Sequence, residues 1–201
     1  MFADRTDAGR RLARRLEYLR GRGDAVVLGL PRGGVVVAYE VARVLHAPLD
    51  IVMVRKVGVP FQPELAMGAV GEEDVRVVNA GGSAAAVVYA DTTGLTADER
   101  VELDTRARRF RAGRPRAVLA GKTAIVVDDG VATGSTARAA CRAARSRGAN
   151  RIVLAAPVAS PSVVAALTDV ADEIVCIETP SPLFSVGEWY HTTSPRPATP
   201  R

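Results

Sequence analysis

Residues 124–136 read Ala-Ile-Val-Val-Asp-Asp-Gly-Val-Ala-Thr-Gly-Ser-Thr, and the rest of the chain is arranged around them. The apolar, β-branched start is typical of a parallel strand buried on both faces. Two adjacent carboxylates, Asp128 and Asp129, follow at the strand end, where α/β proteins place their ligands. A loop of small and hydroxylated residues then leads into a helix predicted over 137–144. Because the N–H groups at a helix N-terminus favour an anion, the stretch predicts two acids beside a phosphate site.

Strands and helices alternate along the chain on both sides of this stretch. The spacing of Ala8, Leu12, Leu16 and Leu19 predicts an amphipathic helix over 4–20. Further strands are predicted over 25–30, 49–54, 151–158 and 173–177, and further helices over 35–45, 96–110 and 161–170. The alternation predicts an α/β fold, with a parallel sheet flanked by helices.

Residues 61–121 separate two predicted core strands, which is long for a plain crossover. Short strands are predicted within this excursion at 65–70 and 75–78. We expect it to form either a flap over the site or an inserted subdomain.

Two more segments contain groups that could meet an anion. Pro31-Arg32-Gly33-Gly34 follows the first predicted strand, and it forms either an anion-binding loop or a plain tight turn. Arg55 and Lys56 follow the second predicted strand, where they could meet a phosphate or remain solvated.

Rival nucleotide and catalytic motifs do not fit this chain. Residues 29–34, Gly-Leu-Pro-Arg-Gly-Gly, lack the Gly-x-Gly-x-x-Gly spacing of dinucleotide folds. The Walker-like Gly121-Lys122-Thr123 precedes a strand instead of following one, His46 and His191 are isolated, and no Gly-x-Ser-x-Gly elbow is present. Two acids before a phosphate loop instead suit a ribose 5-phosphate, since carboxylates accept hydrogen bonds from sugar hydroxyls.

Composition limits the remaining classes. The 201 residues are 48% hydrophobic and 24% charged, which predicts one soluble globular domain over 1–201. No apolar run approaches the roughly 18 residues of a membrane span, and no signal peptide is recognised. Cys141 and Cys176 lie in apolar patterns, which predicts buried free thiols and a cytoplasmic location. The formal net charge of +5 suits an anionic partner or solvated helix faces, but without a basic–aromatic cluster we expect no nucleic-acid partner.

Residues 126–136 closely resemble the signature of the type I phosphoribosyltransferases, which bind 5-phosphoribosyl 1-diphosphate (PRPP). The resemblance runs from about residue 24 to 190, and residues 29–34 and 186–190 resemble segments of uncharacterised bacterial proteins with this domain. It implies a core over about 24–180, a flap over about 61–121, a hood from 1–23 and 181–193, and we expect a disordered tail at 194–201.

The resemblance also implies roles for individual residues. Asp128 and Asp129 would bind the ribose hydroxyls and meet Mg²⁺ indirectly, through PRPP or water. The 5-phosphate would be held by Thr133, Gly134, Ser135 and Thr136, and Ala132 would also belong to the PRPP-binding residues. Arg32 with the amides of Gly33 and Gly34 would hold pyrophosphate after a cis Pro31–Arg32 peptide, with Arg55 or Lys56 nearby. The implied catalytic residues are Arg32, Lys56, Asp128 and Asp129.

The implied reaction is displacement of pyrophosphate from PRPP by a small nitrogenous acceptor, with Mg²⁺ as cofactor. The resemblance makes hypoxanthine and guanine less expected, because 6-oxopurine members have an Asp where this chain has Ala132. Trp189 or Tyr190 could stack on a base, or both could anchor the tail. We also expect a homo-oligomer. The alternatives are a PRPP-binding regulatory protein without transferase activity and a phosphatase-like hydrolase.

Overall fold

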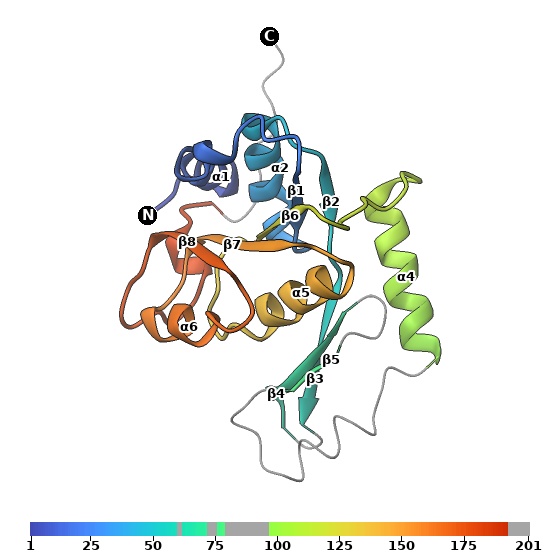
Figure 1. Ribbon diagram of the computed structural model, residues 1–201. Helices are drawn as coiled ribbons and strands as arrows, with labels where there is room; N and C mark the ends of the chain where they lie inside the picture. The colour runs from blue at the N-terminus through green and yellow to red at the C-terminus, as the bar shows by residue number, and fades with distance from the viewer. Residues whose placement is uncertain (60–61, 72–75, 79–96, 193–201) are drawn as a thin grey trace.

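A five-stranded parallel sheet lies at the centre of the computed structural model (Figure 1). The structure describes residues 1–59, 62–71, 76–78 and 97–192, and for those among 55–100 and for Leu103 it describes the backbone alone. The strand order is β2-β1-β6-β7-β8. These strands are β1 (Ala25–Gly29), β2 (Leu49–Ile51), β6 (Thr123–Val127), β7 (Arg151–Val158) and β8 (Glu173–Glu178). The predicted α/β class with a parallel sheet is confirmed.

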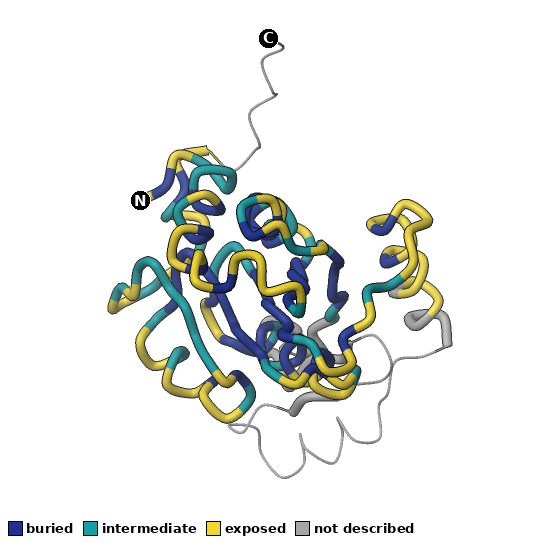
Figure 2. The backbone as a smooth tube through the Cα atoms, turned by 45° about the horizontal axis from the view of Figure 1, so that its top comes forward, coloured by how far each residue is buried: buried dark blue, intermediate teal, exposed yellow. Residues whose placement is uncertain are grey.

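Helices cover both faces of this sheet. The helices on one face are α1 (Arg5–Arg15), η1 (Glu17–Leu19) and α2 (Gly33–Leu45), and those on the other are α5 (Ser135–Ser146) and α6 (Pro161–Ala166) (Figure 1). Successive strand residues point to opposite faces, so Ile125 packs with α1 and α2 whereas Val126 packs with α5. The strands at the centre are therefore buried on both sides (Figure 2).

A second, antiparallel sheet begins before the predicted excursion and extends into it. Its strands are β3 (Val54–Val59), β4 (Gln62–Gly71) and β5 (Arg76–Val78), and α4 (Ala97–Arg111) follows them. The short strands and the helix predicted here are confirmed. Part of the proposed flap and the predicted tail over 194–201 lie outside the described residues.

The strand predicted over 49–54 was wrong at its end. Gly29, the last residue of β1, pairs with Ile51, so β1 offers no partner beyond this point. The chain then leaves the central sheet, and Val54 begins β3.

Two smaller expectations also have an outcome. The Pro31–Arg32 peptide is cis, as the resemblance implied. Both cysteines are free; Cys141 is buried, but Cys176 is only half-buried because β8 is an edge strand. Among the described residues, no helix combines the length and the apolar character needed to cross a bilayer.

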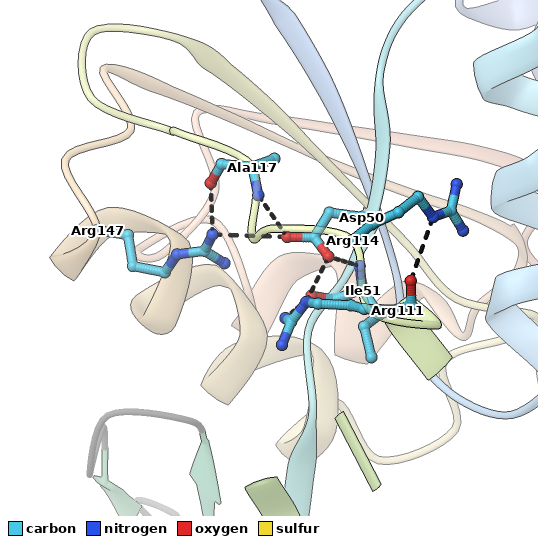
Figure 3. Close-up of polar contacts among 6 residues, drawn as sticks. All are labelled: Asp50, Ile51, Arg111, Arg114, Ala117 and Arg147. Atoms are coloured by element: carbon cyan, nitrogen blue, oxygen red, sulfur yellow. Dashed lines mark hydrogen bonds and ion pairs between the residues drawn. The ribbon is translucent and has the colours of Figure 1, made fainter. Parts of the chain in front are cut away.

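A buried ionic cluster joins the end of α4 to the central sheet (Figure 3). The Asp50 carboxylate on β2 accepts hydrogen bonds from Arg111 Nε at 2.7 Å, from Ala117 N–H at 3.0 Å and from Ile51 N–H at 2.8 Å. Arg147, at the end of α5, lies 3.7 Å from the same carboxylate and donates to the Ala117 carbonyl at 2.7 Å. The side chains of Asp50 and Arg111 are only 4% and 10% exposed, so the cluster is shielded from water.

The hydrogen bonds set the charge state of Asp50. Burial by itself raises the pKa of this carboxyl, but the bonds from Arg111, Ala117 and Ile51 outweigh burial and hold the pKa below its ordinary value.

We predict that Asp50→Asn lowers the free energy of unfolding by about 3–5 kcal/mol, because it leaves buried guanidinium groups without their counter-charge. Asp169→Asn is the control: Asp169 pairs with Arg138, but its side chain is 58% exposed, so a loss below about 1 kcal/mol is expected. Urea titrations measure both. Equal losses in the two variants would contradict the prediction.

The contribution of Asp50 to stability is also expected to depend on pH. Its folded pKa lies below the unfolded value of about 3.9, so in the interval between them the unfolded chain binds more protons. The contribution is therefore complete above the unfolded value and lost as pH falls through the folded one. Urea titrations of wild type and Asp50→Asn at descending pH should show their difference shrinking, and a difference that grows on acidification would refute the assignment.

Candidate active site

The central strands β1 and β6 end side by side where the strand order changes direction, the position at which open α/β sheets bind ligands. The chain leaves β1 through Leu30, Pro31 and Arg32 into α2, and it leaves β6 through Asp128 and Asp129. Leu30 N–H donates to the Val127 carbonyl at 2.9 Å, which keeps the two exits together. Two loops that lie far apart in the sequence thus meet at one edge of the sheet.

The contact between these loops has room for glycine alone. A Cβ atom at Gly33 would lie 2.0 Å from Asp129 Oδ2, and one at Gly34 would lie 2.8 Å from both the Asp128 Cα and the Val127 carbonyl oxygen. Neither Gly33 nor Gly34 has a positive φ. Glycine is therefore favoured at these positions by the lack of space for a side chain and not by the backbone conformation. The glycine pair places the N-terminus of α2 directly against the two acids.

This N-terminus suits an anion. The N-cap residue of α2 is Arg32, which is exposed and makes no side-chain capping hydrogen bond. The first N–H groups of the helix therefore have no side-chain cap to neutralise them. Arg32, Gly33 and Gly34 lie at this helix start, and their predicted contact with pyrophosphate stays a prediction.

The loop from β6 to α5 leads into a second helix N-terminus, which also suits an anion. Gly134 has a φ of 80°, caps α5 and supplies no side-chain hydrogen bond. In front of it lies a cavity of about 160 Å³. The predicted residues that line this cavity are Asp128, Ala132, Thr133, Gly134 and Thr136. Ser135 is buried and does not line it.

The opposite wall of this cavity comes from the C-terminal part of the chain. Val186 lines the cavity, and a Cβ atom at Gly130 would lie 2.4 Å from Val186 Cγ1. Gly130 therefore allows the segment before η3 (Gly187–Trp189) to close over the loop after β6.

Asp129 is held by a residue that the sequence did not single out. Arg5, in the first turn of α1, donates to Asp129 Oδ2 through Nε at 2.7 Å and lies 2.6 Å from it through Nη2. Tyr190 donates its hydroxyl to the Asp129 carbonyl, and the Arg5 guanidinium lies over the Tyr190 ring, 5.0 Å from its centroid. Asp129 is thus bound by both ends of the chain.

Tyr190 has an anchoring position. It is 5% exposed, and its ring centroid lies 5.6 Å from that of Phe2, whose N–H donates to the Trp189 carbonyl at 2.8 Å. Burial and the nearby Asp129 raise the pKa of Tyr190. This arrangement is one of the two that the sequence left open, and base stacking by Trp189 or Tyr190 stays a prediction.

Arg55 and Lys56 lie outside the central sheet. They belong to β3, where they pair with Val70 and Ala69 of β4. Because the structure describes their backbone alone, their approach to a pyrophosphate group stays a prediction.

The two acids fit a magnesium ion that shares its ligands with a substrate. Among the described residues, no three His, Cys, Asp or Glu side chains gather as a closed metal site. Asp128 and Asp129 offer adjacent carboxylates beside two helix N-termini that have no side-chain cap. Mg²⁺ prefers oxygen ligands, keeps several waters and binds through one or two carboxylates plus substrate phosphates, which matches this donor set.

Comparisons with known proteins identify the family. The profile described as "Phosphoribosyl transferase domain" matches residues 4–191. Proteins from two strains of Mycobacterium tuberculosis, CDC 1551 and H37Rv, carry phosphoribosyl transferase in their names, and each is 53% identical over 193 residues. The match covers 94% of this chain but 43% of theirs, so the chain spans less than half the length of the curated relatives it matches.

A solved structure is similar over most of its length. The crystal structure of TT1426 from Thermus thermophilus matches with a TM-score of 0.76 and 44% identity, covering 94% of this chain and 90% of that one. Together with the profile match over residues 4–191, these similarities show that the chain belongs to the phosphoribosyl transferase family.

Proposed function

We propose that this chain transfers the 5-phosphoribosyl group of PRPP to a nitrogenous acceptor and releases pyrophosphate. The observation that carries the proposal is the close contact of Gly33 and Gly34 with Asp128 and Asp129 in a member of the phosphoribosyl transferase family. The N-termini of α2 and α5 border these acids, and each favours an anion. PRPP has phosphate groups at two ends of one ribose, which suits this order of sites.

Each part of PRPP has a proposed partner. The carboxylates of Asp128 and Asp129 accept hydrogen bonds from the ribose hydroxyls. The hydroxyls of Thr133 and Thr136 and the first N–H groups of α5 hold the 5-phosphate. Arg32 and the amides of Gly33 and Gly34 hold the pyrophosphate, with Arg55 or Lys56 in support.

The transfer itself needs charge stabilisation more than proton chemistry. The nitrogen lone pair of the acceptor forms a bond to C1 while the bond from C1 to the pyrophosphate oxygen breaks, and its electrons leave with pyrophosphate. The transition state is expected to resemble an oxocarbenium ion. Arg32 and the α2 amides stabilise the growing negative charge on the leaving group, and bound Mg²⁺ would add positive charge there.

Two parts of the proposal concern water and the acceptor. The insertion over 61–121 would act as a flap that excludes water, which otherwise hydrolyses PRPP. The hood, formed by 1–23 and 181–193, would face the acceptor. Ala132, which is exposed at the cavity, has no carboxylate for the acceptor, and this favours acceptors other than 6-oxopurines. A homo-oligomer stays a prediction.

We predict that wild-type protein with PRPP, Mg²⁺ and the correct base or amine releases pyrophosphate, as measured by a coupled pyrophosphate assay over a panel of acceptors. The double variant Asp128→Asn and Asp129→Asn should lose release, because neutral amides are weaker acceptors for the ribose hydroxyls. Binding of PRPP without release for any acceptor would favour the regulatory alternative, and release of inorganic phosphate would indicate a hydrolase.

A substitution at Gly34 should damage the site through its geometry. We predict that Gly34→Ala costs about 1–3 kcal/mol in stability and weakens PRPP binding, because the new methyl group meets backbone atoms at 2.8 Å that cannot turn away. Gly187→Ala is the matched control, since the atom nearest to its Cβ lies 3.8 Å away. Thermal unfolding and calorimetric titration with PRPP measure both effects. Wild-type affinity in Gly34→Ala would argue against this site.

A further inference from the structure

We propose that Arg5 is a positioning residue of the donor site, which holds one oxygen of Asp129 so that the other faces the ribose. The inference rests on the proposed function, because it takes the ribose of PRPP as the group that Asp129 binds. It adds a residue from α1, outside the strand–loop–helix segments to which the sequence assigned the donor site.

The geometry separates the two oxygens of the Asp129 carboxylate. Both contacts from Arg5, at 2.7 Å and 2.6 Å, fall on Oδ2. Within the part of the chain that the structure describes, no hydrogen bond falls on Oδ1. The pair is also partly open, since the side chains of Arg5 and Asp129 are 20% and 18% exposed. One oxygen is therefore fixed by the protein while the carboxylate still reaches solvent, where a ligand enters.

Arg5 is itself held in place by its neighbours. Its guanidinium lies over the Tyr190 ring, and the hydroxyl of that ring donates to the backbone carbonyl of Asp129. On the other side, a Cβ atom at Gly33 would lie 2.7 Å from Arg5 Nε, so the side chain also borders the start of α2. A side chain locked on two sides can orient its partner before the ligand arrives, which reduces the ordering that binding requires.

The positive charge of Arg5 also supports a role in PRPP binding. Asp128 and Asp129 are adjacent, and Asp129 N–H donates to Asp128 Oδ1 at 2.8 Å. PRPP carries several negative charges, so an Asp129 carboxylate without a counter-charge would repel it. Arg5 supplies that counter-charge without occupying Oδ1. Removal of Arg5 is therefore expected to weaken PRPP binding. If Arg5 instead blocked the site, its removal would strengthen PRPP binding.

The test is calorimetric titration of PRPP with Mg²⁺ into wild type and Arg5→Ala. We expect the Kd for PRPP to rise about ten- to a hundredfold, the order associated with hydrogen bonds to charged groups. Arg5→Lys, which keeps the charge but not the two-atom contact, should fall between them. Thermal unfolding of each variant checks that it is folded.

Arg11→Ala is the matched control on the same helix. Arg11 lies over the Phe2 ring at 4.5 Å, donates to the Met1 carbonyl at 3.0 Å and pairs with Glu178 at 3.4 Å, so its removal also loosens the joined chain ends. None of these contacts involves Asp129. The control should keep the wild-type affinity for PRPP.

A double-mutant cycle tests whether Arg5 acts through Asp129. Arg5→Ala should weaken PRPP binding far less in an Asp129→Asn background than in wild type. Unchanged or tighter binding in Arg5→Ala, additive losses in the cycle, or an equal loss in Arg11→Ala would each overturn the inference while leaving the proposed function standing. If wild type does not bind PRPP, the proposed function fails and the inference fails with it.

Discussion

The candidate site depends on the lack of space between the turn at Gly33–Gly34 and the end of β6. Because β1 and β6 are neighbours in the sheet, the loops that follow them leave from the same edge, and the bond from Leu30 to Val127 holds them together. At this separation a single methyl group would overlap Asp129 or the backbone of Asp128. The two glycines therefore let a helix N-terminus and two carboxylates share one position.

The sheet edge supplies the two loops, and the chain ends complete the site. Residues near both termini meet where Phe2 N–H donates to the Trp189 carbonyl, and from this junction Arg5 reaches Asp129. Val186, a few residues earlier, closes the cavity over Gly130. Glycines thus stand on both sides of the acid pair, at 33–34 and at 130, where other elements pack closely against the chain. Rigid packing of this kind keeps polar groups aimed at a ligand without a large ordering cost.

The sequence predicted what depends on local pattern. Runs of β-branched residues before Asp128 and after Asp24 identified the central strands, and the small-residue loops after them gave two candidate anion positions, which stay predictions. The end of β2 was predicted wrongly because it depends on where β1 stops. That point is set by the register between the two strands and not by the local sequence. The buried ion pairs of Asp50 could not be predicted from the sequence either. Asp50 lies in a short strand, and its partners Arg111 and Arg147 come from helices that are distant in the sequence.

Arg5 shows the same limit at the site itself. On the predicted helix it is one of several arginines, and nothing local separates it from Arg10 or Arg11. Its contact with Asp129 exists because α1 packs against α2 and against β7 and β8, and this packing depends on the whole fold.

The two arginine–aspartate pairs of this chain illustrate how exposure assigns different roles to similar chemistry. In the Asp50–Arg111 pair, the side chains are 4% and 10% exposed, and backbone N–H groups take up the remaining carboxylate capacity. Such a pair cannot exchange a partner for a ligand without leaving a buried charge unpaired, so its role is to join elements. In the Arg5–Asp129 pair, the side chains are 20% and 18% exposed and both contacts fall on one carboxylate oxygen. The remaining oxygen can accept a hydrogen bond from a ligand while the pair stays intact, which is why this pair, and not the buried one, suits a substrate site.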